Sequence, residues 1–362
     1  MPTSGPLPPM LVMGAGAWGT ALAMHFAGLA RHRGGGPVGL WARDPAQAER
    51  ISRTRENERY LSGFRLPPDL HVWADLAQAA AQWRAAGQAP VSGQSPGGLL
   101  VLAGPLSSLP EAAEQVLAVL GPSALPGEGL IWLAKGVWFD GRRAPAFAAD
   151  LLSPLSHWPS GALSGPSFAQ EVARGLPSAL ALASANLDWA KATAGQLHGG
   201  SMRIYPTDDL AGVQLGGAMK NVLAIAAGVS DGLDLGGNAR AALLTRGLAE
   251  AARLGQALGA RAETFLGLGA LGDLILTATG DLSRNRRVGL LLAQGRALGA
   301  ILSDLGHVAE GVGAAPALAQ LARTLQVDCP IVAAVDDLLS ERLAVAQVCD
   351  RLMGRAMTQE LH

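Results

Sequence analysis

The stretch MLVMGAGAWGTALA, residues 10–23, decides the fold of the first half of this chain. An apolar run at residues 10–13 is followed directly by the pattern Gly14-x-Gly16-x-x-Gly19 and then by a helical pattern. In this order of strand, turn and helix, the first glycine permits the turn, the second lets a pyrophosphate approach the backbone, and the third lets the helix pack closely on the strand. Free N–H groups at the start of the helix would bind the phosphates. The pattern predicts a dinucleotide-binding βα unit, against the alternative of a packing turn in a glycine-rich chain.

The same region could be mistaken for a membrane segment, because residues 11–30 carry no formal charge and are long enough to span a bilayer. The first cation is Arg31, so the basic region of a signal peptide is missing. The stretch also contains several glycines and His25. We therefore expect a buried βα unit and no integral membrane segment.

Length and composition set further bounds. A chain of 362 residues suggests about two domains, and 49% hydrophobic against 16% charged residues is enough to form a sizeable core. The net charge of -1 provides no overall field that would attract nucleic acid or an anionic membrane. Cys329 and Cys349 cannot form a disulfide framework and fit no zinc spacing. We expect a reducing, cytoplasmic setting and no metal.

Lysine is rare in this chain. Of the 28 basic side chains, only Lys135, Lys191 and Lys220 are lysines. Unlike arginine, a lysine amine can lose its proton, so a lysine inside a glycine-rich or polar motif is a candidate for catalysis.

Apolar runs that alternate with helical patterns predict an α/β Rossmann-type, doubly wound parallel sheet. The expected strands are residues 10–13, 38–41, 99–103, 130–133 and 179–183, and the expected helices 18–29, 45–53 and 110–120. Residues 87–98, rich in Gly, Pro, Ser and Gln, indicate an exposed flexible loop. Helical patterns dominate after about residue 206, for example at residues 239–258, 288–294 and 332–342. We predict a dinucleotide-binding domain over residues 1–205 and a mostly α-helical substrate and catalytic domain over residues 206–362.

The end of the second expected strand bears on cofactor choice. A ribose-binding acid is normally found there, but this chain has Ala42 followed by Arg43. An arginine can pair with a 2′-phosphate and stack on adenine, which favours NADP(H) and leaves NAD(H) open. Alternatively, Arg43 is a surface charge and Asp44 caps the next helix.

Two further stretches lie where open α/β sheets bind ligands. Lys135 and Gly136 follow the apolar run at residues 130–133, at the carboxyl end of a strand. Residues 164–171, SGPSFAQE, form a glycine-proline turn whose small residues suit backbone contact with a ligand. Either stretch could equally be structural.

The second half contains the strongest candidates for chemistry. Lys220 lies among small residues on an expected helix, where desolvation would lower its pKa toward the neutrality that a proton donor needs. Asp273 and Thr277 offer a carboxylate and a hydroxyl downstream. The run SRNRR, residues 283–287, places forked cations beside an amide, as in a phosphate site, although a solvated helix face is the alternative.

Taken together, these motifs resemble the bacterial type of NAD(P)-dependent glycerol-3-phosphate dehydrogenase. The matching segments run in order from residue 14 to about residue 313 and include residues 14–23, 134–136, 164–171, 212–228, 238–250, 271–277 and 283–289. The resemblance implies reversible reduction of dihydroxyacetone phosphate by NAD(P)H to sn-glycerol 3-phosphate, the backbone for phospholipid synthesis. It also implies a homodimer formed through the helical domain.

The resemblance implies roles for individual residues. Lys220 matches the catalytic general acid and base, Lys135 a lysine that contacts substrate and cofactor, and Asp273 the carboxylate near the catalytic amine. The implied substrate contacts include all three of these and also Gly165, Ser167, Asn221, Thr277, Ser283, Arg284 and Asn285. The cofactor contacts, with the glycines of the turn, are Gly14, Gly16, Ala17, Trp18, Gly19, Arg43, Lys135, Ala169, Arg284, Val308 and Glu310.

The chemistry agrees with these roles. Hydride transfer to a carbonyl leaves negative charge on its oxygen, which an ammonium can stabilise and protonate. Arginine, with a pKa above about 12, is a poor proton donor at neutral pH. Two of the three lysines fall on positions where the resemblance requires lysine, and Lys191 is assigned to the surface.

Three departures from the family pattern concern the cofactor side. Gly104-Pro105-Leu106 replaces a Pro-Ser turn and so removes a hydroxyl, Ala134 replaces a threonine, and residues 82–98 form a longer loop than usual. Two alternatives stay open. One is a related two-domain dehydrogenase whose substrate, a hydroxy acid or a ketopantoate-like compound, carries a carboxylate. The other is a non-catalytic NAD(P)H sensor, which would not need the two lysines and Asp273.

Overall fold

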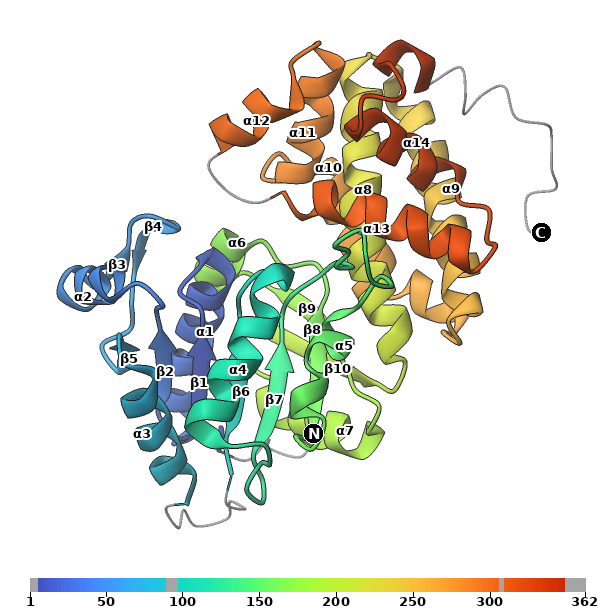
Figure 1. Ribbon diagram of the computed structural model, residues 1–362. Helices are drawn as coiled ribbons and strands as arrows, with labels where there is room; N and C mark the ends of the chain where they lie inside the picture. Colours follow the sequence, from blue (N-terminus) through green and yellow to red (C-terminus); the bar gives the residue numbers. More distant parts are fainter. Residues whose placement is uncertain (1–5, 89–96, 306–308, 349–362) are drawn as a thin grey trace. The chain divides into compact units, whose positions relative to one another are not determined.

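The computed structural model describes residues 6–88, 97–305 and 309–348 (Figure 1). These residues form two compact units. The N-terminal unit comprises the described residues up to 135 together with 148–213, and the C-terminal unit comprises 136–147 together with those from 214 onward. The boundary expected between residues 205 and 206 lies inside strand β10.

The N-terminal unit is built on an eight-stranded sheet of order β10-β9-β8-β7-β6-β1-β2-β5. Its strands are β1 (Met10–Met13), β2 (Val38–Trp41), β5 (Leu70–Trp73), β6 (Leu99–Leu102), β7 (Gly129–Trp132), β8 (Ser160–Ser164), β9 (Ser178–Ala183) and β10 (Met202–Thr207). A separate two-stranded ribbon pairs β3 (Glu56–Asn57) with β4 (Leu61–Arg65). The helices are α1 (Ala17–Arg33), α2 (Pro45–Thr54), α3 (Leu76–Gln88), α4 (Leu109–Leu120), α5 (Ala148–Leu151), α6 (Ala169–Ala173) and α7 (Leu187–Leu197).

The central strands explain why the sequence reads as short apolar runs. All four residues of β1, β2, β6 and β7 are buried, as expected for strands with both faces covered. On α1, Leu22 and Phe26 are completely buried in the same core. Residues 11–30 are therefore the βα unit that the glycine pattern predicted, which confirms the fold class.

The sheet is mixed rather than wholly parallel, since β8 and β9 pair antiparallel while their other neighbours pair parallel. Five strands were not predicted: β5, β8 and β10 of this sheet, and β3 and β4 of the separate ribbon. β8 is rich in small residues. β10 contains Pro206, and an edge strand tolerates a proline because one side of the strand needs no N–H donors for pairing.

The prediction of a loop over residues 82–98 is wrong for residues 82–88, which belong to helix α3. Helix α3 continues to Gln88 because Trp83 is anchored in the core. This side chain is 4% exposed, and its indole N–H donates to the carbonyl of Pro9 at 3.1 Å. Residues 89–96 lie outside the described residues.

The C-terminal unit is mostly helical, as predicted. Its helices are α8 (Leu210–Gly232, which begins in the N-terminal unit), α9 (Gly236–Ala257), α10 (Asp273–Thr279), α11 (Arg284–Ala293), α12 (Leu298–Leu305), α13 (Glu310–Thr324) and α14 (Pro330–Leu339). Residues 262–266 form a 3-10 turn and Leu268–Gly272 a π-helical turn. Residues 221–230 of α8 are all buried, so this helix is the core of the unit.

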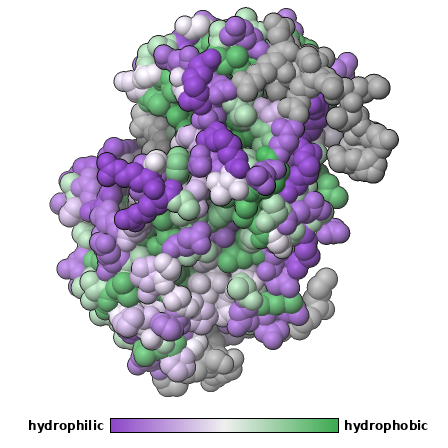
Figure 2. Space-filling view, turned by 45° about the vertical axis from the view of Figure 1, so that its right-hand side comes forward, coloured by the Kyte–Doolittle hydropathy of each residue, from purple (hydrophilic) through white to green (hydrophobic). Residues whose placement is uncertain are grey.

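Helix α8 is also apolar enough, by length and composition, to cross a membrane. Within the described residues, the bent pair formed by residues 262–279 and 284–293 passes the same test as one span. However, 83% of the apolar window of α8 is buried inside the protein, which is typical of a core helix. On the face shown in Figure 2, hydrophilic and hydrophobic residues are interspersed.

A buried carboxyl group joins α9 to α14. Glu250 is 2% exposed and accepts hydrogen bonds from the backbone N–H groups of Ile331, at 2.9 Å, and Val332, at 3.3 Å. Burial raises its pKa from 4.5 to about 7, although both hydrogen bonds and nearby Arg253 act in the opposite direction. The neutral form of Glu250 is therefore favoured in the folded protein below about pH 7.

We expect this group to make stability depend on pH. The contribution is fully present below about pH 4.5, and it is lost as pH rises through about 7, because only the unfolded chain releases the proton in this range. Over this range of pH, the free energy of unfolding falls by on the order of 3 kcal/mol. Thermal unfolding of wild type and Glu250→Gln between pH 4.5 and 8 measures it, and the stability of the variant relative to wild type should rise with pH. Glu263→Gln, at an exposed position, is the control; parallel pH profiles of wild type and Glu250→Gln would contradict the prediction.

Candidate active site

The glycine turn between β1 and α1 has the geometry that its sequence predicted. Gly14 has φ +125°, and a Cβ there would lie 3.0 Å from the carbonyl carbon of Ala103. A Cβ on Gly19 would lie only 2.1 Å from the Gly14 carbonyl oxygen, so a side chain would separate the helix from the turn. A Cβ on Gly16, in contrast, would meet no atom within 4 Å. The first and third glycines are needed for packing, and the second leaves an open approach.

The start of α1 is suited to bind an anion. Gly16 is the N-cap, and no side chain caps this helix end. The N–H of Gly16 has no hydrogen-bond partner among the described residues. Ala17 and Trp18, both half-buried, begin the helix. Uncapped N–H groups and the positive end of the helix dipole favour phosphate at this position.

Arg43 follows β2 at the same edge of the sheet, since β1 and β2 are parallel neighbours. Its side chain is 71% exposed, and its only ion pair in the described ranges is a 3.4 Å contact with Glu111. Asp44 caps α2 by accepting from the backbone N–H of Ala46 at 2.9 Å, so the capping interpretation of Asp44 is confirmed. The Arg43 guanidinium is thus largely available to a ligand.

Three predicted residues meet where β7 and β8 end. Lys135 follows β7, and its Nζ donates to the carbonyl of Gly165 at 3.2 Å. The hydroxyl of Ser167 donates to the same oxygen at 3.0 Å. Ala169 lies close by in sequence and begins α6. The carboxyl ends of these parallel strands therefore bring together a lysine, a hydroxyl and a glycine turn at the edge of the sheet that binds ligands in this fold.

The turn at residues 104–106 lacks the hydroxyl of the family pattern, but the hydroxyl of Ser108 lies beside it. The Ser108 hydroxyl donates to the carbonyl of Pro105 at 2.7 Å. A Cβ on Gly104 would lie 2.4 Å from this hydroxyl oxygen. Ser108 therefore fills the space that a side chain at residue 104 would need.

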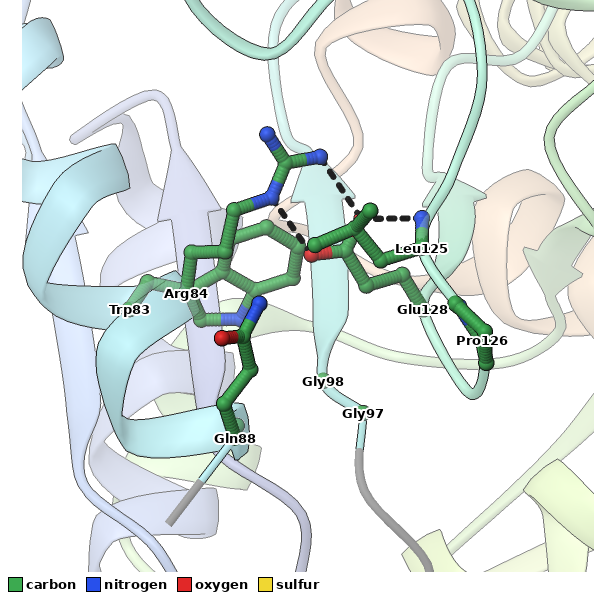
Figure 3. A pocket seen from close by; sticks show the side chains of 9 residues that line it. Trp83, Arg84, Gln88, Gly97, Gly98, Leu125, Pro126 and Glu128 are labelled. Carbon is green, nitrogen blue, oxygen red and sulfur yellow. Dashed lines mark hydrogen bonds and ion pairs between the residues drawn. The ribbon is translucent and has the colours of Figure 1, made fainter.

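A small pocket in the N-terminal unit lies at the opposite edge of the sheet, where β6 and β7 begin (Figure 3). Arg84 donates to both oxygens of Glu128, at 2.7 and 2.8 Å, and the backbone N–H of Leu125 donates to the same carboxylate at 2.8 Å. This paired carboxylate stabilises the unit, and the pocket lies away from the glycine turn.

In the C-terminal unit, the predicted catalytic residues are in direct contact. Nζ of Lys220 lies 2.7 Å from Oδ1 of Asp273 and 3.0 Å from the hydroxyl oxygen of Thr277. The Thr277 hydroxyl donates to the carbonyl of Asp273 at 2.7 Å and therefore presents a lone pair to the amine. The side chains of Lys220 and Asp273 are 11% and 2% exposed.

Close packing one helical turn earlier fixes this contact. Gly216 precedes Lys220 on α8, and Ala270 precedes Asp273 in the π-helical turn. A Cβ on Gly216 would lie 2.7 Å from the Cβ of Ala270. The two backbones can therefore approach closely only with glycine at residue 216. Single π-helical turns are frequent at functional sites.

The contact also bears on the expected proton donor. Desolvation alone disfavours a charged lysine, whereas a carboxylate at 2.7 Å favours the ammonium form. The two effects oppose each other, so the proton-donor role of Lys220 stays a prediction.

Asn221 and Asn285 bond to each other inside the C-terminal unit. The Asn285 amide donates to the Asn221 side-chain oxygen at 2.8 Å and accepts from the Gly311 N–H at 3.0 Å. Asn221 donates to Glu310 at 3.3 Å. The amides are 2% and 7% exposed and link α8 and α11 to the start of α13. Val308, the other half of the expected cofactor-binding pair with Glu310, lies outside the described residues.

Two arginines near the start of α11 differ in whether they form ion pairs. Ser283 caps the helix by accepting from the Arg286 N–H at 3.2 Å. The Arg286 guanidinium is held by Asp231 and Asp281. Arg284 is exposed and makes no ion pair within the described part of the chain. An unpaired guanidinium beside the N-terminus of a helix is suited to bind phosphate.

Sequence reasoning missed two residues of the N-terminal unit. The side-chain amides of Gln47 and Asn57 both donate to the carbonyl of Ala15, at 2.9 Å each. No local pattern marks these residues, because their partner lies far away in sequence. In the described ranges, no group of three or more His, Cys, Asp or Glu side chains is placed to hold a metal ion.

These features define a class of protein. A Rossmann-type unit with an open glycine turn, followed by a helical unit that contains a buried Lys–Asp pair, is the arrangement of a two-domain nicotinamide-dependent dehydrogenase.

Comparison with known proteins identifies the family. Residues 9–190 match the N-terminal domain, and residues 209–350 the C-terminal domain, of NAD-dependent glycerol-3-phosphate dehydrogenase. The chain belongs to this family, which confirms the resemblance seen in the sequence.

Close relatives cover nearly the whole chain. Glycerol-3-phosphate dehydrogenase (NAD(P)+) of Methylibium petroleiphilum is 50% identical over 351 residues, which is 97% of this chain and 98% of the relative. The enzyme of the same name from Variovorax paradoxus is 51% identical over 359 residues, covering 95% and 96%. The crystal structure of glycerol-3-phosphate dehydrogenase from Coxiella burnetii superposes with a TM-score of 0.83 at 33% identity, covering 97% of this chain and 99% of that one.

Proposed function

We propose that this protein catalyses the reversible, NAD(P)H-dependent reduction of dihydroxyacetone phosphate to sn-glycerol 3-phosphate and so supplies the backbone of glycerophospholipids. The observation that carries the proposal is the contact of Lys220 with Asp273 in a chain that belongs to this family. A protein that only sensed the cofactor would not need a buried proton donor.

The N-terminal unit fits a nicotinamide dinucleotide. The open side of Gly16 and the uncapped start of α1 would hold the pyrophosphate. Arg43 would contact the adenosine end, and Lys135 and Ala169 lie at the carboxyl ends of strands or just beyond them, where the nicotinamide half binds in this fold. When bound, the reduced cofactor supplies the hydride.

Lys220 acts as the general acid in reduction and as the general base in oxidation. As the carbonyl carbon of the substrate gains a hydride, negative charge develops on its oxygen, and the Lys220 ammonium stabilises this charge. The proton then passes from Nζ to the oxygen, which gives the alcohol; in the oxidation direction Nζ takes it back. Asp273 and Thr277 hold the amine in place throughout.

The phosphate of the substrate needs a cationic site. Arg284 and the backbone N–H groups at the start of α11 supply one, while Ser283 caps the helix and Asn285 fixes α11 against α8. Lys135, Gly165 and Ser167 are proposed as further substrate contacts. Asn221 then supports the substrate site indirectly, through its hydrogen bonds with Asn285 and Glu310.

Three further statements complete the proposal. NADP(H) is preferred over NAD(H), because the exposed Arg43 can pair with a 2′-phosphate. The protein acts as a homodimer, as the resemblance implies. It works in the cytoplasm.

Initial-rate measurements test the reaction. We expect dihydroxyacetone phosphate to drive oxidation of NADPH and NADH by the purified protein, because the site combines a proton donor with a phosphate-binding group. Ketopantoate and simple 2-keto acids are the matched comparison, since their carboxylate could occupy the Arg284 site. Oxidation with a keto acid but not with the triose phosphate would replace this proposal with the related-dehydrogenase alternative, and no oxidation with either would favour the sensor.

Lys220→Arg separates positive charge from proton donation. The variant keeps a cation beside Asp273, but turnover should fall on the order of a hundredfold or more, because arginine holds its proton too tightly. Lys191→Arg, at an exposed position, is the control and should behave like wild type. Near-normal turnover of Lys220→Arg would remove the proton-donor role.

Arg43→Ala tests the cofactor preference. Removing the guanidinium should raise the KM for NADPH about tenfold and leave the KM for NADH nearly unchanged. Only NADPH carries the 2′-phosphate that would form a charged hydrogen bond with this guanidinium. Arg53→Ala, at an exposed position of α2, is the matched control. Equal effects on the two cofactors would show that Arg43 does not contact the 2′-phosphate.

A further inference from the structure

The carbonyl of Ala15, in the middle of the glycine turn, is held from inside the N-terminal unit. Gln47, on α2, donates from Nε2 at 2.9 Å, and Asn57, on β3, donates from Nδ2 at 2.9 Å. Asn57 also donates to the hydroxyl of Thr20 on α1 at 2.8 Å. The segment that follows β2 therefore binds both the turn and the helix that starts from it.

This anchor determines the direction of the next N–H group. A trans peptide is planar, with its C=O and N–H pointing in opposite directions, and the described residues contain no cis peptide. Because the Ala15 carbonyl points toward Gln47 and Asn57, the Gly16 N–H points away from them. This N–H has no partner among the described residues, and Gly16 has open space beside its backbone.

The anchor is rigid because it is buried. Gln47 is 8% exposed, Asn57 is 1% exposed and Thr20 is fully buried. Two donors to one carbonyl use both of its lone pairs, so the peptide cannot flip without leaving buried polar groups unpaired. A peptide that is already oriented loses less freedom when a ligand binds to its N–H.

We infer that Gln47 and Asn57 are positioning residues for cofactor binding, which hold the Ala15–Gly16 peptide so that its N–H points at the pyrophosphate. The inference rests on the proposed use of a nicotinamide dinucleotide. It assigns the two residues to the pyrophosphate, which NADH and NADPH share, and not to the 2′-phosphate.

Asn57→Asp is the sharpest test, because it keeps the size of the side chain and replaces the donor with a carboxylate that cannot donate to Ala15. We expect the Kd for NADH and for NADPH, titrated without substrate, to rise by the same factor of about tenfold or more. At saturating cofactor, kcat and the KM for dihydroxyacetone phosphate should change less than about twofold. The equal effect on both cofactors distinguishes this role from that of Arg43.

A second variant and a control keep the test sound if the buried carboxylate prevents folding. Gln47→Met removes one donor at nearly constant side-chain length and should raise both Kd values by a smaller, equal factor. Asn186→Ala removes the N-cap of α7 elsewhere in the same unit and should lower the melting temperature without changing either Kd. Wild-type Kd values in folded Asn57→Asp or Gln47→Met, with only the melting temperature lowered, would overturn the inference. The titration contains no substrate, so its result does not depend on which ketone the enzyme reduces.

Discussion

The contact between Lys220 and Asp273 is the interaction on which the C-terminal unit is organised. A buried ion pair is favourable only when its geometry is good and its remaining polar atoms are hydrogen-bonded, since both charges lose their hydration. Thr277 meets this need by accepting from the amine and donating to a backbone carbonyl. The close approach of Gly216 to Ala270 sets the distance. A helix packed less tightly would leave the lysine either solvated or alone in an apolar core.

The N-terminal unit solves a similar problem with backbone groups. The site proposed for the pyrophosphate is the uncapped start of α1, and a free N–H is useful to a ligand only when its direction is fixed. Glycines at residues 14 and 19 allow the turn, while Gln47 and Asn57 hold one peptide of it. In both units, therefore, a close backbone approach is combined with side-chain amides, hydroxyls or carboxylates that remove the remaining freedom.

The sequence was most informative where function and local structure depend on neighbouring residues. The βα unit at residue 10 could be predicted from the spacing of its glycines, and the N-cap at Asp44 was one of the two alternatives for residues 43 and 44. The rarity of lysine marked Lys220 as a candidate, and its catalytic role stays a prediction. Strands β8 and β10 were missed, since small residues and a proline carry little strand signal. Asn57 was missed because its partner Ala15 is distant in the chain. The internal bonding of Asn221 and Asn285 likewise depends on how α8, α11 and α13 pack, which no local pattern records.

The position of Gln47 constrains any redesign of nucleotide preference. Residues 43–47 contain the arginine that faces the ligand edge, the cap of α2 and one of the two anchors of the glycine turn. Because Gln47 is inferred to hold the Ala15–Gly16 peptide, grafting this whole loop from a homologue would exchange all three residues at once and weaken binding of both NADH and NADPH. On the roles proposed for Arg43 and Gln47, engineering of nucleotide preference should alter residue 43 alone and retain the glutamine four positions later.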